Sequence, residues 1–169
     1  RWDLSKAICN LACFVTKWTP QYDKKLWRII CYVHNTKHFR LIGWVGDHPD
    51  SGHLQPHLYT DADFGSCSSQ RSTAGVHLCC RGNNTSFPIN ASSKRHGGVS
   101  TSTPEAEIVS TSIGWRRSGV PILTIAEVIL GQQGKITIEL VSHQYNSAMV
   151  RVIETGRNPT MRHLARCHR

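Results

Sequence analysis

Acidic residues are scarce in this chain, and several features that mark non-globular proteins are missing. The 169 residues include 11 Asp or Glu against 20 Lys or Arg. No uninterrupted apolar run approaches the ~18 residues of a membrane-spanning helix, so such a helix is not expected. There is no repeat or low-complexity tract, and 39% hydrophobic with 18% charged residues is typical of a globular protein. This composition argues against collagen, coiled coil and wholesale disorder.

The start of the given sequence also lacks the pattern of a secretory leader. No basic segment followed by an apolar one opens the chain, so nothing favours secretion. The first residue is Arg1 rather than Met, and we therefore expect a piece of a longer protein. A length of 169 residues allows one domain with an appendage and is short for two ordinary domains.

The cysteines do not form a recognisable framework. There are seven, so a complete set of intramolecular disulfides is impossible, and their spacing matches no paired CxxC zinc pattern. We expect buried free thiols. A weaker alternative is a structural metal site formed by His163, Cys167 and His168, because the first two lie at helical i,i+4 spacing.

The positive charge favours a polyanionic partner such as nucleic acid. The formal net charge is +9 with neutral histidines, and ten histidines add charge below neutral pH. Basic surfaces also serve solubility, so charge by itself leaves both explanations open.

The first third of the chain predicts a helical appendage. Apolar residues from Leu4 to Val15 recur at helical spacing, and a second amphipathic helix begins at Thr19 and Pro20 and runs to about residue 34. A polar, turn-rich stretch at residues 46–52 then predicts a linker. We expect the appendage and linker to occupy residues 1–50 and the main domain residues 54–169.

The main domain has the pattern of an α/β fold in which strands precede helices. Short strands joined by Ser/Gly/Asn-rich turns predict an antiparallel meander at its start. The expected elements are strands at 57–61, 75–80 and 86–92, a helix from Ser102 that ends at Gly119 and Pro121, a helix at 122–130, a strand around Ile136, Ile138 and Leu140, and a helix at 147–155 closed by Gly156.

Carboxylates stand at two places in this pattern. Asp61 and Asp63 end the first strand, and Glu105 and Glu107 lie in the first turn of the helix after the meander. A strand carboxylate facing a carboxylate on a packed helix can hold divalent metal ions. Such residues also serve as turn formers or complement a helix dipole, so spacing alone leaves both roles open.

Several motifs, in order and at matching intervals, resemble the RNase H domain of copia-type retrotransposon polyproteins. The stretches YTDADFG, QRSTAG, SSKR and STSTPEAEIVS resemble the family's YSDADWAG, RRSTSG, SSKKQ and SSTEAEY. RWDLSKAICNLACFVTKWTP and LWRIICYV resemble the end of the family's reverse transcriptase. YNSAMVRVIETGRNPTMRHLARCHR resembles its DNQSA-to-RTKH region. The resemblance covers essentially the whole chain.

The resemblance implies a ribonuclease H-like fold, with a mixed five-stranded sheet whose first three strands are antiparallel. It implies cleavage of the RNA strand of RNA–DNA hybrids by two Mg²⁺ or Mn²⁺ ions held by four carboxylates, of which Asp61 matches the first and Glu107 the second. Helical periodicity does not choose between Glu105 and Glu107, which are ~200° apart, so this choice rests on the resemblance. Glu105 then serves as the capping-box acid for Ser102, and Asp63 as a turn or supporting residue.

Two departures from the family pattern predict impaired activity. Tyr145 stands at the position of the third carboxylate, and a neutral phenol does not replace an anionic ligand of Mg²⁺. The sequence stops at Arg169, before the strand and helix that carry the fourth. The expected fold is thus β-β-β-α-β-α after a two-helix appendage, with the last strand and helix missing, as in a degenerate or truncated element copy. Hybrid cleavage is expected to be absent or very weak, and a non-catalytic nucleic-acid-binding remnant is the alternative.

The basic motifs predict a face that binds the hybrid. Arg71, Ser72 and Thr73 lie in one family motif, and Lys94 and Arg95 in another. Cations and hydroxyl groups suit phosphates and 2′-hydroxyls. The alternative is that Arg71 and Lys94 are solvated turn residues. The resemblance further implies the rest of a retroelement polyprotein as partner, no membrane, and an intracellular location in a cytoplasmic particle or the nucleus.

Overall fold

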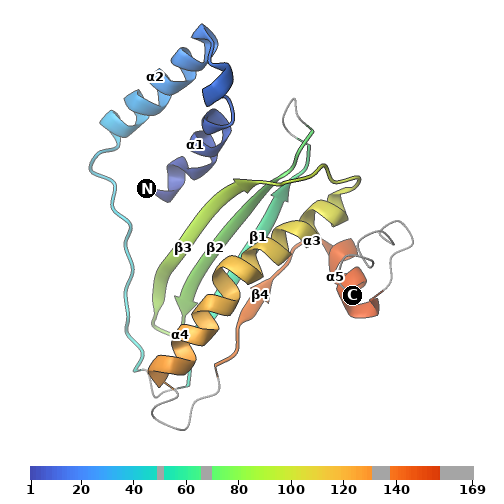
Figure 1. Cartoon of the computed structure of the whole chain (residues 1–169). Coiled ribbons are helices and arrows are strands. Elements are labelled where there is room, and N and C mark those ends of the chain that lie inside the picture. Colours follow the sequence, from blue (N-terminus) through green and yellow to red (C-terminus); the bar gives the residue numbers. More distant parts are fainter. Residues whose placement is uncertain (49–51, 66–69, 131–137, 157–169) are drawn as a thin grey trace.

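A mixed β-sheet organises this protein. The computed structural model describes residues 1–48, 52–65, 70–130 and 138–156. Within these residues the strand order is β3-β2-β1-β4, with antiparallel β1–β2 and β2–β3 pairs and a parallel β1–β4 pair (Figure 1). The strands are β1 (Gln55–Asp63), β2 (Thr73–Arg81), β3 (Ser86–Arg95) and β4 (Val141–His143). The predicted α/β class and antiparallel meander are confirmed.

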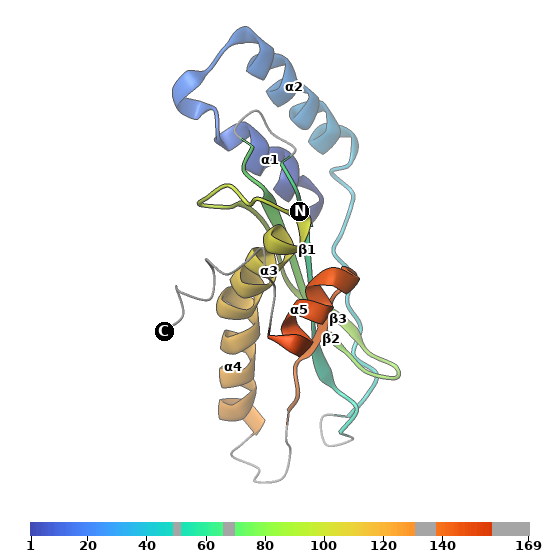
Figure 2. The ribbon, with the colours of Figure 1, turned by 90° about the vertical axis from the view of Figure 1, so that its right-hand side faces the viewer.

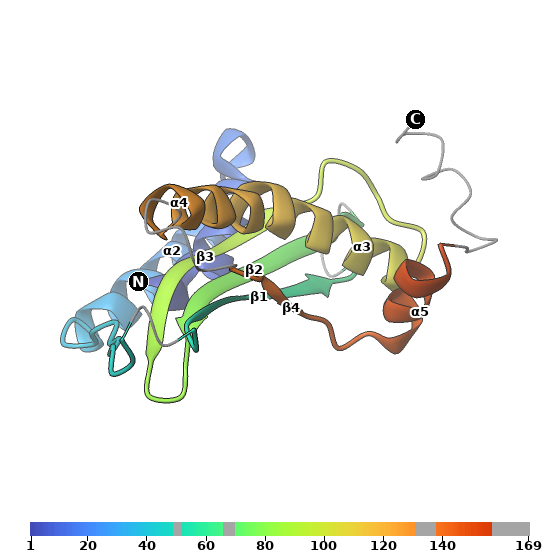
Figure 3. The same cartoon turned by 90° about the horizontal axis from the view of Figure 1, so that it is seen from below.

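Helices α3 and α4 cross one face of the sheet, as Figures 1 and 3 show, while α1 packs against β3. Figure 2 shows α2 projecting past the end of the sheet. The helices are η1 (Trp2–Leu4), α1 (Ser5–Ala12), η2 (Val15–Lys17), α2 (Pro20–Asn35), α3 (Thr103–Gly114), the π-helical turn η4 (Trp115–Gly119), α4 (Val120–Leu130) and α5 (Ser147–Thr155). The two predicted appendage helices are confirmed.

Strand alternation places the core between the sheet and α3. Leu58 of β1 and Val76 and Leu78 of β2 are almost fully buried and form one cluster. Trp115 and Ile122 pack against it from the helical layer. Because side chains alternate along a strand, Tyr59 and Asp61 lie on the opposite face from Leu58.

Small residues on α3 allow this helix to approach β1 closely. Ala106, Ser110 and Gly114 recur every four residues and are all buried. A Cβ atom added at Gly114 would lie 2.5 Å from Cγ2 of Thr60. The glycine therefore sets the separation between the helix and the strand.

The prediction that Gly119 and Pro121 end the helix is wrong. The chain stays helical from α3 through η4 into α4, and the amide of Val120 donates to the carbonyl of Trp115 across a π-helical turn. Proline in a regular helix clashes with the carbonyl four residues earlier. The wider turn and the place of Pro121 in the first turn of α4 both accommodate the ring.

The predicted fourth strand is displaced toward the C-terminus. Ile138 and Leu140 are not in a strand, residue 136 lies outside the described part, and β4 begins at Val141, opposite His57. Leu140 packs against the core cluster instead. Its apolar character reflects burial rather than strand pairing.

Stacked rings hold the short strand β4 to β1. The ring of His143 lies between those of His57 and Tyr59, with centroid separations of 5.0 and 4.1 Å. Nδ1 of His57 and Nε2 of His143 are 2.8 Å apart, within hydrogen-bond distance. The hydroxyl of Tyr59 also accepts a hydrogen bond from Arg81. These side-chain contacts hold the three paired residues of β4 against β1, on the face of the sheet opposite the core.

Local capping explains several helix ends. Oγ of Ser102 accepts from the amide of Glu105 at the start of α3, and Oδ1 of Asn146 accepts from the amide of Met149 at the start of α5. Gly156, at φ 63°, closes α5 as predicted.

The predicted linker at residues 46–52 begins against the sheet. Trp44 pairs with Ser86, and the amides of Gly46 and Asp47 donate to Oγ1 of Thr85 in the β2–β3 turn. Residues 49–51 lie outside the described part. The division into residues 1–50 and 54–169 stays a prediction.

Replacing Gly114 by alanine tests the close approach of α3 to β1. We expect Gly114→Ala to destabilise the fold by about 1–3 kcal/mol, because the added methyl group forces the helix and Thr60 apart. Urea unfolding measures this change. Thr60→Ser in the same chain removes the clashing Cγ2 and should recover much of the loss, and failure to recover would contradict the explanation.

Acid should weaken the side-chain contacts between β1 and β4. Burial lowers the pKa of His57 below its ordinary value, and nearby His143 and Arg81 add to the effect. At position 57 the unfolded chain therefore binds a proton more readily than the folded chain. The stability that neutral His57 contributes is fully present above the ordinary histidine pKa of about 6.5 and is lost as the pH falls through and below that value.

The measurement is the free energy of unfolding at about pH 7.5 and about pH 5.5, on either side of the ordinary histidine pKa. His57→Gln should lose less stability between these values than the parent chain. An equal loss in both proteins would show that His57 does not contribute.

Candidate functional site

The structure brings Asp61 and Glu107 together at one end of the sheet. Asp61 lies near the end of β1 and is exposed, whereas Glu107 lies in α3 and is 8% exposed. Burial raises the pKa of Glu107, the negative charge of Asp61 raises it further, and a hydrogen bond from the backbone of Ala62 partly opposes the shift. The two carboxylates are therefore close enough to interact.

Glu105 has a structural role beside this pair. Its Oε2 accepts hydrogen bonds from the amide of Thr101 at 2.8 Å and from Oγ1 of Thr101 at 2.6 Å. Its own amide donates to Ser102. The carboxylate of Glu105 therefore bonds to Thr101, one residue before the predicted capping-box partner Ser102, and holds the turn before α3 in place.

Asp63 connects the end of β1 to the appendage. Its carboxylate forms an ion pair with Lys6 of α1. The side chain of Trp2 makes an edge contact with His77 of β2, with ring centroids 5.7 Å apart. Both contacts place the start of the chain on the sheet face that carries Tyr59 and Asp61.

Tyr145 follows β4 and faces solvent. Its side chain is 84% exposed and, with Asp61 and Asp63, lines a cavity of about 360 Å³ beneath the start of the chain. Among the residues that the structure describes, no three His, Cys, Asp or Glu side chains are grouped to hold a metal ion. The described donors therefore do not fit a two-metal site, which needs several converging oxygen ligands.

A buried polar network joins the two elements that carry the carboxylates. Oγ1 of Thr60 and Oγ1 of Thr111 are 2.9 Å apart, and Nε2 of Gln144 donates to both hydroxyls. The network links β1, α3 and the residue after β4. The sequence pattern did not predict this network, because strand alternation favours an apolar residue at the buried position that Thr60 occupies.

The two basic motifs meet across the β2–β3 pair. Thr73 is opposite Arg95 and Ala74 is opposite Lys94. Arg71 and Lys94 are exposed, and Arg95 is partly buried. The motifs therefore reach the same sheet end as Asp61.

Ser72 and Thr73 differ from the other predicted nucleic-acid contacts in being buried. They are 0% and 3% exposed, and their hydroxyls have no hydrogen-bond partner among the described residues. The carbonyl of Ser72 accepts from the amide of His96. Neither hydroxyl is at the surface in this arrangement.

Some predicted features lie outside the described residues. These are the three residues of the alternative metal site, His163, Cys167 and His168. Five cysteines that the structure describes are free thiols, and burial raises the pKa of Cys79 and Cys80. No described helix is long and apolar enough to cross a membrane.

Comparison of the chain with protein-family models, with curated proteins and with solved structures found no match.

The raised pKa of Glu107 has a testable origin. Asp61→Asn removes the nearby negative charge, so the pKa of Glu107 should fall toward its ordinary value and remain raised only by burial. A carbon-detected NMR titration of the Glu107 carboxyl measures the shift. Asp63→Asn is the matched control, because Asp63 is paired with Lys6 and should leave the titration unchanged. Equal effects of both substitutions would contradict a specific Asp61–Glu107 interaction.

Proposed function

We propose that this chain comprises the end of a reverse transcriptase and an RNase H-like domain from a copia-type retrotransposon polyprotein. Its ancestral activity is hydrolysis of the RNA strand of RNA–DNA hybrids, and in this copy hydrolysis is impaired. The observation that carries the proposal is that Asp61 near the end of β1 and Glu107 near the start of α3 lie at the same end of the sheet, where Glu107 accepts a hydrogen bond from the backbone of Ala62, next to Asp61.

The placement of the four family-like motifs supports this proposal. YTDADFG ends β1, QRSTAG leads into β2, SSKR ends β3 and STSTPEAEIVS opens α3. In the antiparallel meander, the end of β1, the start of β2 and the end of β3 share one edge of the sheet. The fold thus gathers these four motifs at one end of the sheet, as expected if they form a functional surface.

The strand arrangement is a second line of support. The resemblance implies three antiparallel strands followed by a fourth in a mixed sheet, and the order β3-β2-β1-β4 has this form. The parallel pairing of β4 with β1 puts the residues after β4 near Asp61. Position 145 is therefore suitable for a third ligand.

Impairment follows from what stands at that position. Tyr145 supplies a neutral phenol, and the described residues offer only two grouped carboxylates. Half the expected ligand charge holds divalent ions weakly. Binding of nucleic acid depends mainly on cations and survives this loss.

The second candidate is a nucleic-acid-binding remnant with no residual hydrolysis. The exposed cations Arg71 and Lys94 near the carboxylates favour it, because they can contact phosphates whether or not metal is held. The two candidates differ only in cleavage that depends on Asp61.

Restoring the third carboxylate is the decisive experiment. A labelled RNA–DNA hybrid is incubated with Mg²⁺ or Mn²⁺ and with the parent chain, Tyr145→Asp, or Tyr145→Phe as the uncharged control. We expect little or no cleavage by the parent and Tyr145→Phe, and a gain in Tyr145→Asp. Adding Asp61→Asn to Tyr145→Asp should abolish that gain.

Other outcomes separate the candidates. Strong cleavage by the parent chain that disappears in Asp61→Asn would refute the impairment and retain the activity. Hybrid binding without cleavage in every variant would favour the remnant. Absence of both binding and cleavage would refute the proposed function.

A further inference from the structure

Helix α2 has a surface that the fold does not use. Of its 16 residues, only Tyr22, Ile29 and Cys31 are partly covered, and the rest are exposed. Helices in proteins gain most of their stability from tertiary packing. A helix with so little cover points to a contact outside this chain.

One side of α2 carries cations that the described residues leave unneutralised. Lys24, Lys25 and Arg28 fall within an arc of roughly 100° at 100° per residue, and Lys37 and Arg40 follow in the next segment. No acidic residue occurs between positions 24 and 46. None of the five cations forms an ion pair with a described residue.

The start of the chain covers only part of the apolar side of α2, and Leu26, Trp27, Ile30 and Val33 stay exposed. Tyr22 stacks on Phe14 with ring centroids 4.5 Å apart, and Ile29, which lies on the same side of the helix, is partly buried. Lys24 and Arg28 lie on the other side at helical spacing. Helix α2 therefore offers a partner a cationic side that no described residue neutralises and an apolar side that is only partly covered.

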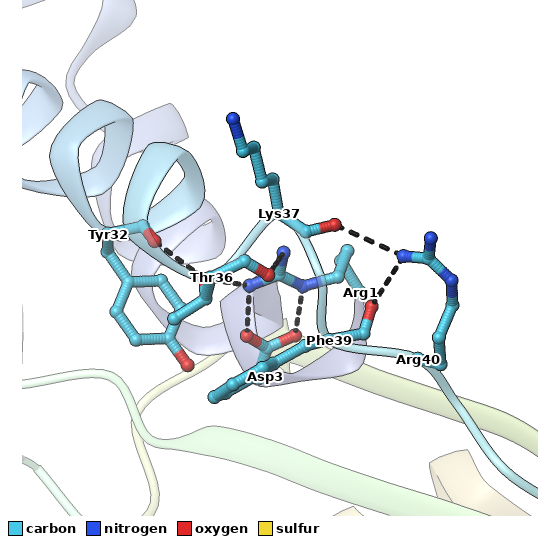
Figure 4. Close-up of polar contacts among 7 residues, drawn as sticks. All are labelled: Arg1, Asp3, Tyr32, Thr36, Lys37, Phe39 and Arg40. Atoms are coloured by element: carbon cyan, nitrogen blue, oxygen red, sulfur yellow. Dashed lines mark hydrogen bonds and ion pairs between the residues drawn. The ribbon is translucent and has the colours of Figure 1, made fainter.

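Arg1 fixes α2 to the start of the chain. Its guanidinium donates to the carbonyl and hydroxyl of Thr36 just after α2, forms an ion pair with Asp3, and lies 5.6 Å from the ring centroid of Tyr32 (Figure 4). The Lys6–Asp63 ion pair attaches the same segment to the end of β1. These contacts tie the C-terminal end of α2 to the start of the chain, which is itself tied to the end of β1.

We propose that Lys24, Lys25 and Arg28 of α2, with Lys37 and Arg40, form a docking surface for the phosphate backbone of a nucleic acid. The ligand class rests on the proposed function, which the docking surface deepens by adding a second contact to the same duplex. A row of exposed cations without an acidic partner among the described residues complements phosphates without reading sequence. Because Leu26, Trp27, Ile30 and Val33 are exposed on the same helix, the test below also measures binding to anionic vesicles.

Salt dependence of binding tests the docking surface. The affinity for a labelled RNA–DNA hybrid is measured between about 50 and 200 mM salt, where each lost phosphate contact lowers the slope by about 0.9. The triple variant Lys24→Gln, Lys25→Gln and Arg28→Gln should lower the slope by roughly 2.7 for three such contacts. Glutamine keeps the helix propensity of lysine and arginine, and circular dichroism checks the helix content.

A charge-matched control separates docking from net charge. Arg116→Gln, Arg117→Gln and Arg151→Gln remove three exposed cations from η4 and α5 and should leave the slope unchanged. Equal slope changes in both triple variants, or no change in either, would overturn the docking surface. Binding of anionic vesicles that depends on α2 while hybrid binding does not would also overturn it.

The two proposals fail in different ways. Hybrid binding that is indifferent to α2, with cleavage gained in Tyr145→Asp, overturns the docking surface and retains the proposed function. A slope that depends on α2, with no cleavage in any Tyr145 or Asp61 variant, refutes recoverable hydrolysis in favour of the non-catalytic remnant and retains the docking surface.

Discussion

The close contact between α3 and β1 is the constraint on which the rest of the structure depends. Only a glycine at position 114 leaves room for Thr60, and Ala106 and Ser110 continue the same narrow stripe along the helix. Because the helix lies so near the strand, a carboxylate in its first turns comes within electrostatic reach of Asp61. The same approach buries the hydroxyls of Thr60 and Thr111 against each other, where Gln144 satisfies them. Small side chains in the core thus position the charged ones at its edge.

The acidic and the basic side chains of this protein differ in how they are held. The acidic side chains near the site are held in place, Glu105 by Thr101 and Asp63 by Lys6, while Asp61 and Glu107 repel each other. Lys24, Lys25 and Arg28 of α2 and Arg71 and Lys94 at the sheet end are exposed and form no ion pair with a described residue. A surface of this kind attracts polyanions over the Debye length and binds them with little preference for sequence. The proposed nucleic-acid role draws on this imbalance more than on any single residue.

Sequence patterns predicted the elements well wherever the signal was local. The Ser102 cap, the proline after Thr19 and the glycine after α5 are all short-range signals, and each marks a real helix end. The apolar run around residues 136–140 failed to locate β4, because burial of Leu140 in the core mimics strand alternation. Pro121 failed as a helix terminator, because a π-helical turn is decided by packing and has no reliable sequence mark.

The candidate site shows the same limit. The motifs pointed to Asp61 and Glu107, yet only the fold shows that they interact. The burial of Ser72 and Thr73 and the network around Gln144 depend on cross-strand and helix contacts far apart in sequence. Spacing along the chain does not encode such contacts. Residues that look alike in a motif, such as Arg71 and Ser72, therefore end in different environments.

The parallel strand β4 also has a consequence for the time course of folding. His57 and His143 meet across 86 residues, whereas the β1–β2–β3 meander closes through short turns. Loop-closure entropy makes such distant pairings slow relative to hairpins. During synthesis from the N-terminus, the meander is complete before β4 leaves the ribosome. The edge of β1 therefore stays unpaired until β4 is synthesised, and Tyr145 comes near Asp61 only in the last stage of folding.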